Sequence, residues 1–205
     1  MDSEMSQKTK PMIKWYDPLE DTNTHAHPFV ADKLNLGDQT QWNLRNGQHH
    51  LHWKKDVRFW TDNEETNGDP DDVLQHCVIS LPVFSEPLRQ ALEDGGITGI
   101  QYLPISIVRP GGEHIEGYAI ANITKVLPAL DADRSILTRF DESRPDRIGE
   151  VSSVMKPVLR KSVVIGHDIF RLEEFSLAYY VSSRFREIFL RNKFTGYTFN
   201  EVPLS

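Results

Sequence analysis

Four histidines around one asparagine come closest to a catalytic arrangement. His49, His50 and His52 precede Asn63, and His76 follows it, which is the order of groups in a metal-dependent nuclease of the histidine-asparagine-histidine type. Such a site needs a compact hairpin and helix that aim both imidazoles at one metal ion. Here an acidic stretch rich in turn residues separates the histidines. We therefore interpret them as surface or partly buried side chains, and a divergent nuclease remains the alternative.

The acidic stretch is the second candidate. Asn67, Gly68 and Pro70 are turn residues, so the stretch is predicted to be an exposed loop. Carboxylates suit calcium, but a calcium loop also needs a glycine at its sixth position and a distal glutamate in register, and neither can be placed. The sequence predicts no metal site, and a basic protein surface suits this loop better. Its carboxylates, with no lysine or arginine among them, are Asp62, Glu64, Glu65, Asp69, Asp71 and Asp72.

Cys77 beside His76 could suggest a nucleophile and its base. Adjacent residues of a strand point to opposite faces, so these two cannot form the required hydrogen bond, and we expect Cys77 to lie in the core. The chain also lacks the signatures of dinucleotide-binding, phosphate-binding, serine hydrolase and zinc protease sites. We therefore expect no catalytic residues and no cofactor.

The elements that would position any site are clearest after residue 77. Ser85 is placed to cap a helix that carries Leu88, Ala91 and Leu92 on one face, and two glycines after residue 94 stop it. The order predicts an α+β fold with a mainly antiparallel sheet. The expected elements are a strand at 78–84, this helix, a strand at 97–108 and a strand at 118–126 that returns beside it.

An internal repeat joins residues 83–102 to residues 180–199 at an offset of 97, without a gap. Apolar residues coincide as well, for example Leu88 with Phe185 and Leu92 with Phe189. Each segment therefore predicts a strand, a capping serine, a short amphipathic helix and a Thr-Gly turn into the next strand. We expect these shared positions to determine the fold. The identical pairs are Ser85 and Ser182, Arg89 and Arg186, Thr98 and Thr195, and Gly99 and Gly196.

The rest of the chain carries weaker patterns. Residues 1–72 are polar with scattered aromatic residues, and we expect irregular structure with short strands there. Residues 127–165 are interrupted by acidic residues and by Pro145 and Pro157. With 205 residues and 39% apolar content, we expect one domain over 1–205, with residues 73–205 as its core.

The charge limits the classes of partner. The chain has 23 Lys and Arg against 30 Asp and Glu, a formal net charge of −7, which disfavours nucleic acid and suits a basic protein. The N-terminus carries acids where a signal peptide has basic residues, and no stretch is apolar enough to span a membrane. With a single cysteine, we expect a cytoplasmic protein. The sequence does not indicate its oligomeric state.

The order of motifs resembles the immunity protein 11 family of bacterial polymorphic toxin systems. The resemblance runs from about Val73 to Val202, and I-K-W-Y-D near the start is also similar. Its specificity comes from the order and spacing of the motifs. They are V-F-S-E-P-L-R-Q-A-L-E-D-G-G-I-T-G-I-Q-Y-L-P-I, Y-A-I-A-N-I, A-L-D-A-D-R-S, D-I-F-R-L and Y-Y-V-S-S-R-F-R-E-I-F-L-R-N-K-F-T-G-Y-T-F.

The resemblance implies a small protein encoded beside a secreted toxin, whose effector domain it binds so that the producer survives. It implies no catalytic residues and does not fix the toxin contacts. If the toxin is a nuclease, carboxylates could stand in for phosphate, so the six residues of the acidic stretch are the first candidates for contact. A regulatory interaction module unrelated to toxins is a further alternative.

Overall fold

The computed structural model describes residues 13–21, 33–36, 38–54, 56–60, 70–75, 81–109 and 111–205. Two sheets dominate these residues, and we name each after one of its inner strands. In the described part, the β1 sheet has the order β13-β1-β12-β11-β8, where β1 is Trp15–Glu20, β8 Val126–Leu127, β11 Ile169–Leu172, β12 Tyr179–Ser182 and β13 Tyr197–Val202.

The β7 sheet has the order β2-β3-β6-β7-β5-β4 within the described ranges. Its strands are β2 Lys33–Leu34, β3 Arg58–Trp60, β4 Val73–Gln75, β5 Pro82–Ser85, β6 Ile100–Val108 and β7 His114–Ile123. A separate hairpin joins β9 Ile136–Arg139 to β10 Val151–Lys156. The described helices are α1 Asp38–Arg45, α2 Glu86–Asp94, α3 Lys161–Val164 and α4 Ser183–Arg191.

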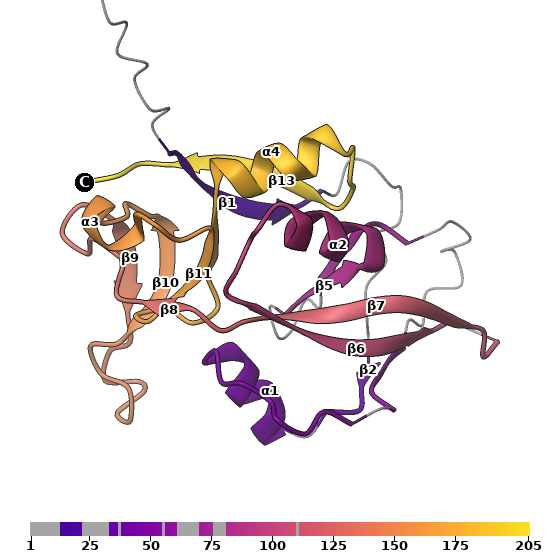
Figure 1. Cartoon of the computed structure of the whole chain (residues 1–205). Helices are drawn as coiled ribbons and strands as arrows, with labels where there is room; N and C mark the ends of the chain where they lie inside the picture. Colours follow the sequence, from indigo (N-terminus) through magenta and orange to yellow (C-terminus); the bar gives the residue numbers. More distant parts are fainter. Residues whose placement is uncertain are drawn as a thin grey trace, which may run out of the picture.

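These elements stack in layers. Helices α2 and α4 contact each other and bury a shared apolar cluster with one face of each sheet; Figure 1 shows α4 next to β1 and β13, and α2 next to β5. The outer face of the β7 sheet packs against Leu44 of α1. The outer face of the β1 sheet packs against the segment from Ala129 to Val164, which includes the β9–β10 hairpin. The predicted α+β fold with mainly antiparallel sheets is confirmed; the described exceptions are the parallel pairs β3–β6 and β8–β11.

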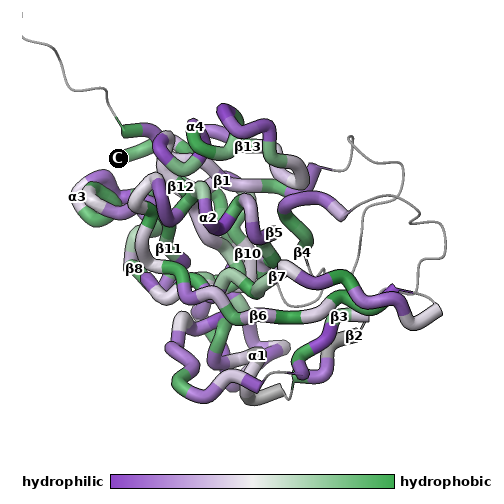
Figure 2. Tube along the Cα trace, turned by 45° about the vertical axis from the view of Figure 1, so that its right-hand side comes forward, coloured by the Kyte–Doolittle hydropathy of each residue, from purple (hydrophilic) through white to green (hydrophobic). Residues whose placement is uncertain are grey.

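Helices α2 and α4 form for the same reasons. Ser85 and Ser182 have extended backbones, and their hydroxyl oxygens accept from the amides of Leu88 and Phe185, as expected of N-caps. Each helix then buries one apolar stripe and exposes its other residues, and Figure 2 shows this mixture of hydrophilic and hydrophobic residues along α4.

The two sheets have equivalent strands in equivalent registers. Strand β7 lies between β6 and β5 and runs antiparallel to both, and β1 lies in the same way between β13 and β12. Ser85 pairs with Tyr118 where Ser182 pairs with Trp15. Strand β1, from the segment where irregular structure with short strands was expected, therefore occupies the position of β7, although it comes first in the chain.

Each Thr-Gly turn lies against the first residue of a strand in the other sheet. Gly196 has φ +99°, and a Cβ there would overlap with the carbonyl oxygen of Val73. Gly99 has φ +92°, and its Cβ would lie 3.5 Å from the carbonyl oxygen of Ile169. Residues with a Cβ rarely adopt such φ values. Because Val73 opens β4 and Ile169 opens β11, the repeat also fixes how the two halves meet.

Candidate functional site: the pocket beside helix α1

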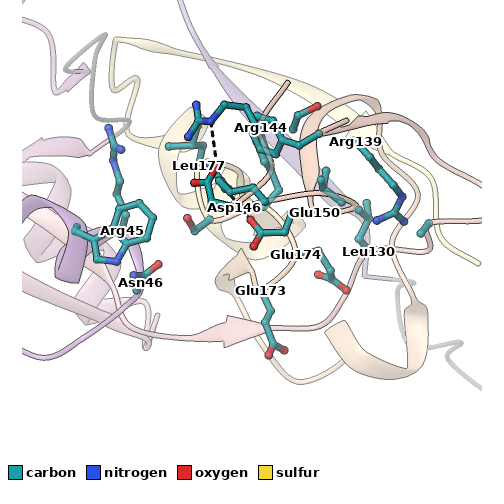
Figure 3. A pocket seen from close by; sticks show the side chains of 18 residues that line it. Arg45, Asn46, Leu130, Arg139, Arg144, Asp146, Glu150, Glu173, Glu174 and Leu177 are labelled. Carbon is teal, nitrogen blue, oxygen red and sulfur yellow. Dashed lines mark hydrogen bonds and ion pairs between the residues drawn. The ribbon is translucent and has the colours of Figure 1, made fainter. Parts of the chain in front are cut away.

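Among the described residues, one concavity is a pocket of about 860 Å³. Its walls come from three segments far apart in the sequence: the end of α1, the hairpin β9–β10 and the loop between β11 and β12 (Figure 3). It is lined by Trp42, Arg45, Asn46, Leu130, Ala132, Arg139, Phe140, Arg144, Asp146, Arg147, Glu150, Val151, Ser152, Glu173, Glu174, Phe175, Ser176 and Leu177.

Helix α1 presents its tryptophan to solvent. Leu44 is fully buried against the β7 sheet, whereas Trp42 is 52% exposed. Residues two apart on a helix point about 200° away from each other, so burying Leu44 turns Trp42 outward into the pocket wall. Leu177, 38% exposed, also lines the pocket. Large, exposed apolar side chains beside charged groups are typical of protein contact sites.

The hairpin loop at 140–150 is held in one shape by its own contacts. Backbone bonds link Phe140 to Glu150 and Gly149. The Arg147 guanidinium lies 4.4 Å from the Phe140 ring centroid, and its Nε donates to a Glu150 carboxylate oxygen at 2.7 Å. A loop fixed in this way loses little conformational entropy when it binds a partner.

The β11–β12 loop supplies two adjacent carboxylates. Glu173 is exposed, and its amide donates to the Leu127 carbonyl. Glu174 is half-buried and accepts from Arg160 at 3.0 Å. Arg171 is fully buried and donates to the Ser176 carbonyl at 2.8 Å, which ties the loop down. Burial lowers the pKa of Arg171 to about 10, so the side chain stays protonated at neutral pH.

Positive and negative side chains alternate around the pocket. Figure 3 shows Arg45 on one side, Arg139 on the other and the carboxylates between them. The hydrogen bond from Arg144 lowers the pKa of Asp146, and burial lowers the pKa of Arg45. A lining with so many ionisable side chains suits a charged or polar partner better than an apolar ligand.

The acidic stretch is only partly described. Asp62, Glu64, Glu65 and Asp69 lie outside the described residues. The expected exposure does not hold at the end of the stretch, since Asp71 is 9% exposed. Asp72 accepts from the Ser85 hydroxyl at 2.7 Å and, with its other oxygen, from the Thr195 amide at 3.1 Å. Its carboxylate therefore links the two halves of the fold.

The histidines do not meet in one described site. His49 and His52 are exposed, while His50 is half-buried with its ring 5.6 Å from that of Trp53. Asn63, His76 and Cys77 lie outside the described residues. Across the described ranges, no group of three or more His, Cys, Asp and Glu side chains could hold a metal ion.

One serine-histidine pair occurs elsewhere, on the β6–β7 hairpin. The Ser106 hydroxyl lies 2.9 Å from His114 Nδ1, and a Glu116 oxygen lies 4.0 Å from the same nitrogen. A catalytic triad needs the serine and the acid on different ring nitrogens, so that one nitrogen accepts the proton while the other is held by the acid. This pair does not have that geometry.

Of the remaining repeated residues, the two arginines each lie over aromatic rings. The Arg89 guanidinium lies 5.7 Å from the Tyr102 ring centroid, and that of Arg186 lies 5.0 Å from Tyr16 and 6.0 Å from Phe199. Arg89 also donates to the Gly117 carbonyl at 3.1 Å. Thr98 is exposed, whereas Thr195 contacts Asp72, so the two threonines differ.

The pocket could not be predicted from the sequence. Its residues come from positions 42–46, 130–152 and 173–177, and no period connects these segments. One signal was present: a tryptophan in the polar run D-Q-T-Q-W-N-L-R. A short polar helix can bury only one narrow face. Because Leu44 lies on the buried face, Trp42, two residues earlier, has to lie on the exposed one.

Comparison with known proteins adds a family match. A model of an immunity protein family, Imm11, matches residues 13–203 and so covers both sheets and every residue of the pocket. No curated protein sequence matches the chain. None of the described helices has the length and apolar character needed to cross a membrane.

Proposed function

The chain belongs to the Imm11 immunity protein family, and from this we propose that it binds the effector domain of one cognate secreted toxin and blocks its activity by covering the active cleft. The family match over residues 13–203 is the observation that carries the proposal. The charge of −7 supports a basic partner, because opposite charges speed encounter and disfavour wrong pairings.

We propose that part of the acidic stretch contacts the toxin, through fewer residues than the sequence suggested. Because Asp72 binds Ser85 and Thr195 and Asp71 is buried, we assign the contact to the four preceding carboxylates, Asp62, Glu64, Glu65 and Asp69. If the toxin is a nuclease, these groups would occupy the positions of substrate phosphates.

Titration calorimetry with the effector domain of the neighbouring toxin gene tests both statements. The unmodified chain should bind, and a variant with Asn or Gln at the four loop positions should bind more weakly and with less dependence on salt concentration. A variant with Gln at Glu142 and Glu187, two exposed carboxylates on the 140–150 loop and on α4, is the control. Unchanged affinity and salt dependence of the loop variant would contradict the loop assignment, and no binding by the unmodified chain would contradict the function.

A further inference from the structure

The basic side chains of the pocket are already occupied within the chain. Arg139 donates to the Gly149 carbonyl at 2.7 Å. Arg144 and Arg147 pair with Asp146 and Glu150, respectively, and both stack on Phe140. Arg45 also has an interaction of its own. A partner would therefore have to displace internal contacts to reach these guanidinium groups.

The acidic groups of the β11–β12 loop are not fully matched. Among the described residues, the Glu173 carboxylate has no ion pair or hydrogen bond. Glu174 uses one oxygen for Arg160, while its other oxygen is shielded and has no donor. A buried acceptor without a donor is unfavourable. The unmatched charge of the pocket is thus negative.

The apolar lining places an exposed indole in the same pocket as the carboxylates. Trp42 presents its exposed indole to the same pocket as the two glutamates, and Leu177 adds an exposed aliphatic surface. An indole face attracts a cation, and a guanidinium stacks on it while its N–H groups reach carboxylates in a forked arrangement. Arginine fits this combination better than lysine, because its planar head can stack and form two hydrogen bonds at once.

We propose that this pocket receives an arginine side chain of the toxin, with the guanidinium stacked on Trp42 and hydrogen-bonded to the exposed carboxylate of Glu173. The inference rests on the proposed function and extends it, because it gives the toxin-facing surface a second contact far from the acidic loop in sequence. The fixed hairpin loop at 140–150 forms another wall of the pocket.

Calorimetry with the full chain and the effector domain tests this pocket. Glu173→Gln removes the unmatched charge without breaking a described contact, and Trp42→Ala removes the stacking surface. We expect each to raise Kd by about tenfold or more, the range of a contact at the centre of an interface. Glu142→Gln, an exposed carboxylate of the hairpin loop outside the pocket lining, and Leu190→Ala, on α4, are matched controls that should leave Kd within about twofold.

A charge-reversal pair identifies the side chain that binds. Glu173→Lys should abolish binding, and a library of effector-domain substitutions should restore it through Arg→Glu at one position. If binding is restored only by substitutions at effector-domain positions that are not arginine, the arginine assignment would be overturned. Unchanged Kd for both Glu173→Gln and Trp42→Ala, with the unmodified chain binding normally, would overturn the pocket as a contact and leave the proposed function standing.

Discussion

Two aspartates show how single side chains connect the halves of this fold. Asp72 accepts from the cap serine of α2 and Asp168 from that of α4, at 2.7 and 2.8 Å. In both cases the serine amide also donates to the carbonyl of the same aspartate, at 2.8 Å. Each serine thus satisfies a helix amide and anchors the loop before a neighbouring strand. Asp72 looked like part of a solvated charge run because its partners lie 13 and 123 residues away.

Substitution of the two cap serines tests how much their hydroxyls stabilise the fold. Ser85→Ala and Ser182→Ala each remove a helix cap and a hydrogen bond to an aspartate, so each should lower the free energy of unfolding by about 1–2 kcal/mol. Urea unfolding followed by circular dichroism measures both, and Ser183→Ala, one residue beyond the second cap, is the control. A loss below about 0.3 kcal/mol at either cap would show that the hydroxyl is not needed there.

Asp17, in the middle of β1, predicts how stability depends on pH. Burial raises its pKa from 3.8 to about 6. The native state therefore binds more protons than the unfolded state between these pH values, and the free energy of unfolding falls as pH rises through this window. Asp17→Asn removes the effect. It should stabilise the protein at pH 7.5 by on the order of 1–2 kcal/mol and change little below pH 4; equal effects at both pH values would contradict this.

At the scale of elements, the sequence predicted the parts that carry local signals. The cap serines, the apolar stripes of α2 and α4 and the β6–β7 hairpin follow from spacing, because each depends on neighbours within a few residues. The position of β1 inside its sheet does not follow from local spacing. Its sequence W-Y-D-P-L-E contains a proline and little alternation, and its place is determined by β12 and β13, more than 150 residues away.

The Thr-Gly turns test how the halves fit together. Gly196 and Gly99 have similar positive φ values, so alanine should strain both backbones alike. Only at Gly196 would the added Cβ overlap with a backbone oxygen, that of Val73. We expect Gly196→Ala to lower the melting temperature clearly more than Gly99→Ala does. Gly111→Ala, with φ +91° and no atom within 4 Å, reports the backbone strain alone. Equal effects at all three positions would show that the close approach is unimportant.

In the whole molecule, two equivalent sheets each pack one face against the α2–α4 pair, and different segments cover their other faces. One is covered by α1 and the other by residues 129–164. The pocket opens where these unlike additions meet the β11–β12 loop. The repeated units therefore build the core, while the unrepeated parts build the candidate contact surface. Such a surface joins distant segments, so neither local periodicity nor the repeat could predict it.

The equivalence of β1 and β7 predicts that the chain can be permuted. Trp15 pairs with Val202, so a short linker can join the end of β13 to the start of β1, as β6 is joined to β7 (Figure 1). With new termini between residues 21 and 33, the permuted chain should unfold cooperatively by calorimetry. Opening the same linked chain at Thr98, next to Gly99, whose carbonyl accepts from the Thr124 amide, should destabilise it more. If the first permutant aggregates and the second does not, the equivalence of β1 and β7 would be contradicted.

The most direct measurement of the central claim is survival of cells that express the toxin. The effector domain of the neighbouring toxin gene is induced in a sensitive bacterium together with this chain, and growth is followed. We expect the unmodified chain to restore growth, Glu142→Gln to do so equally, and Glu173→Lys not to do so, although all three are folded and equally abundant. Cell death in the presence of abundant, folded, unmodified chain would contradict the assignment of this protein as an immunity protein for that toxin.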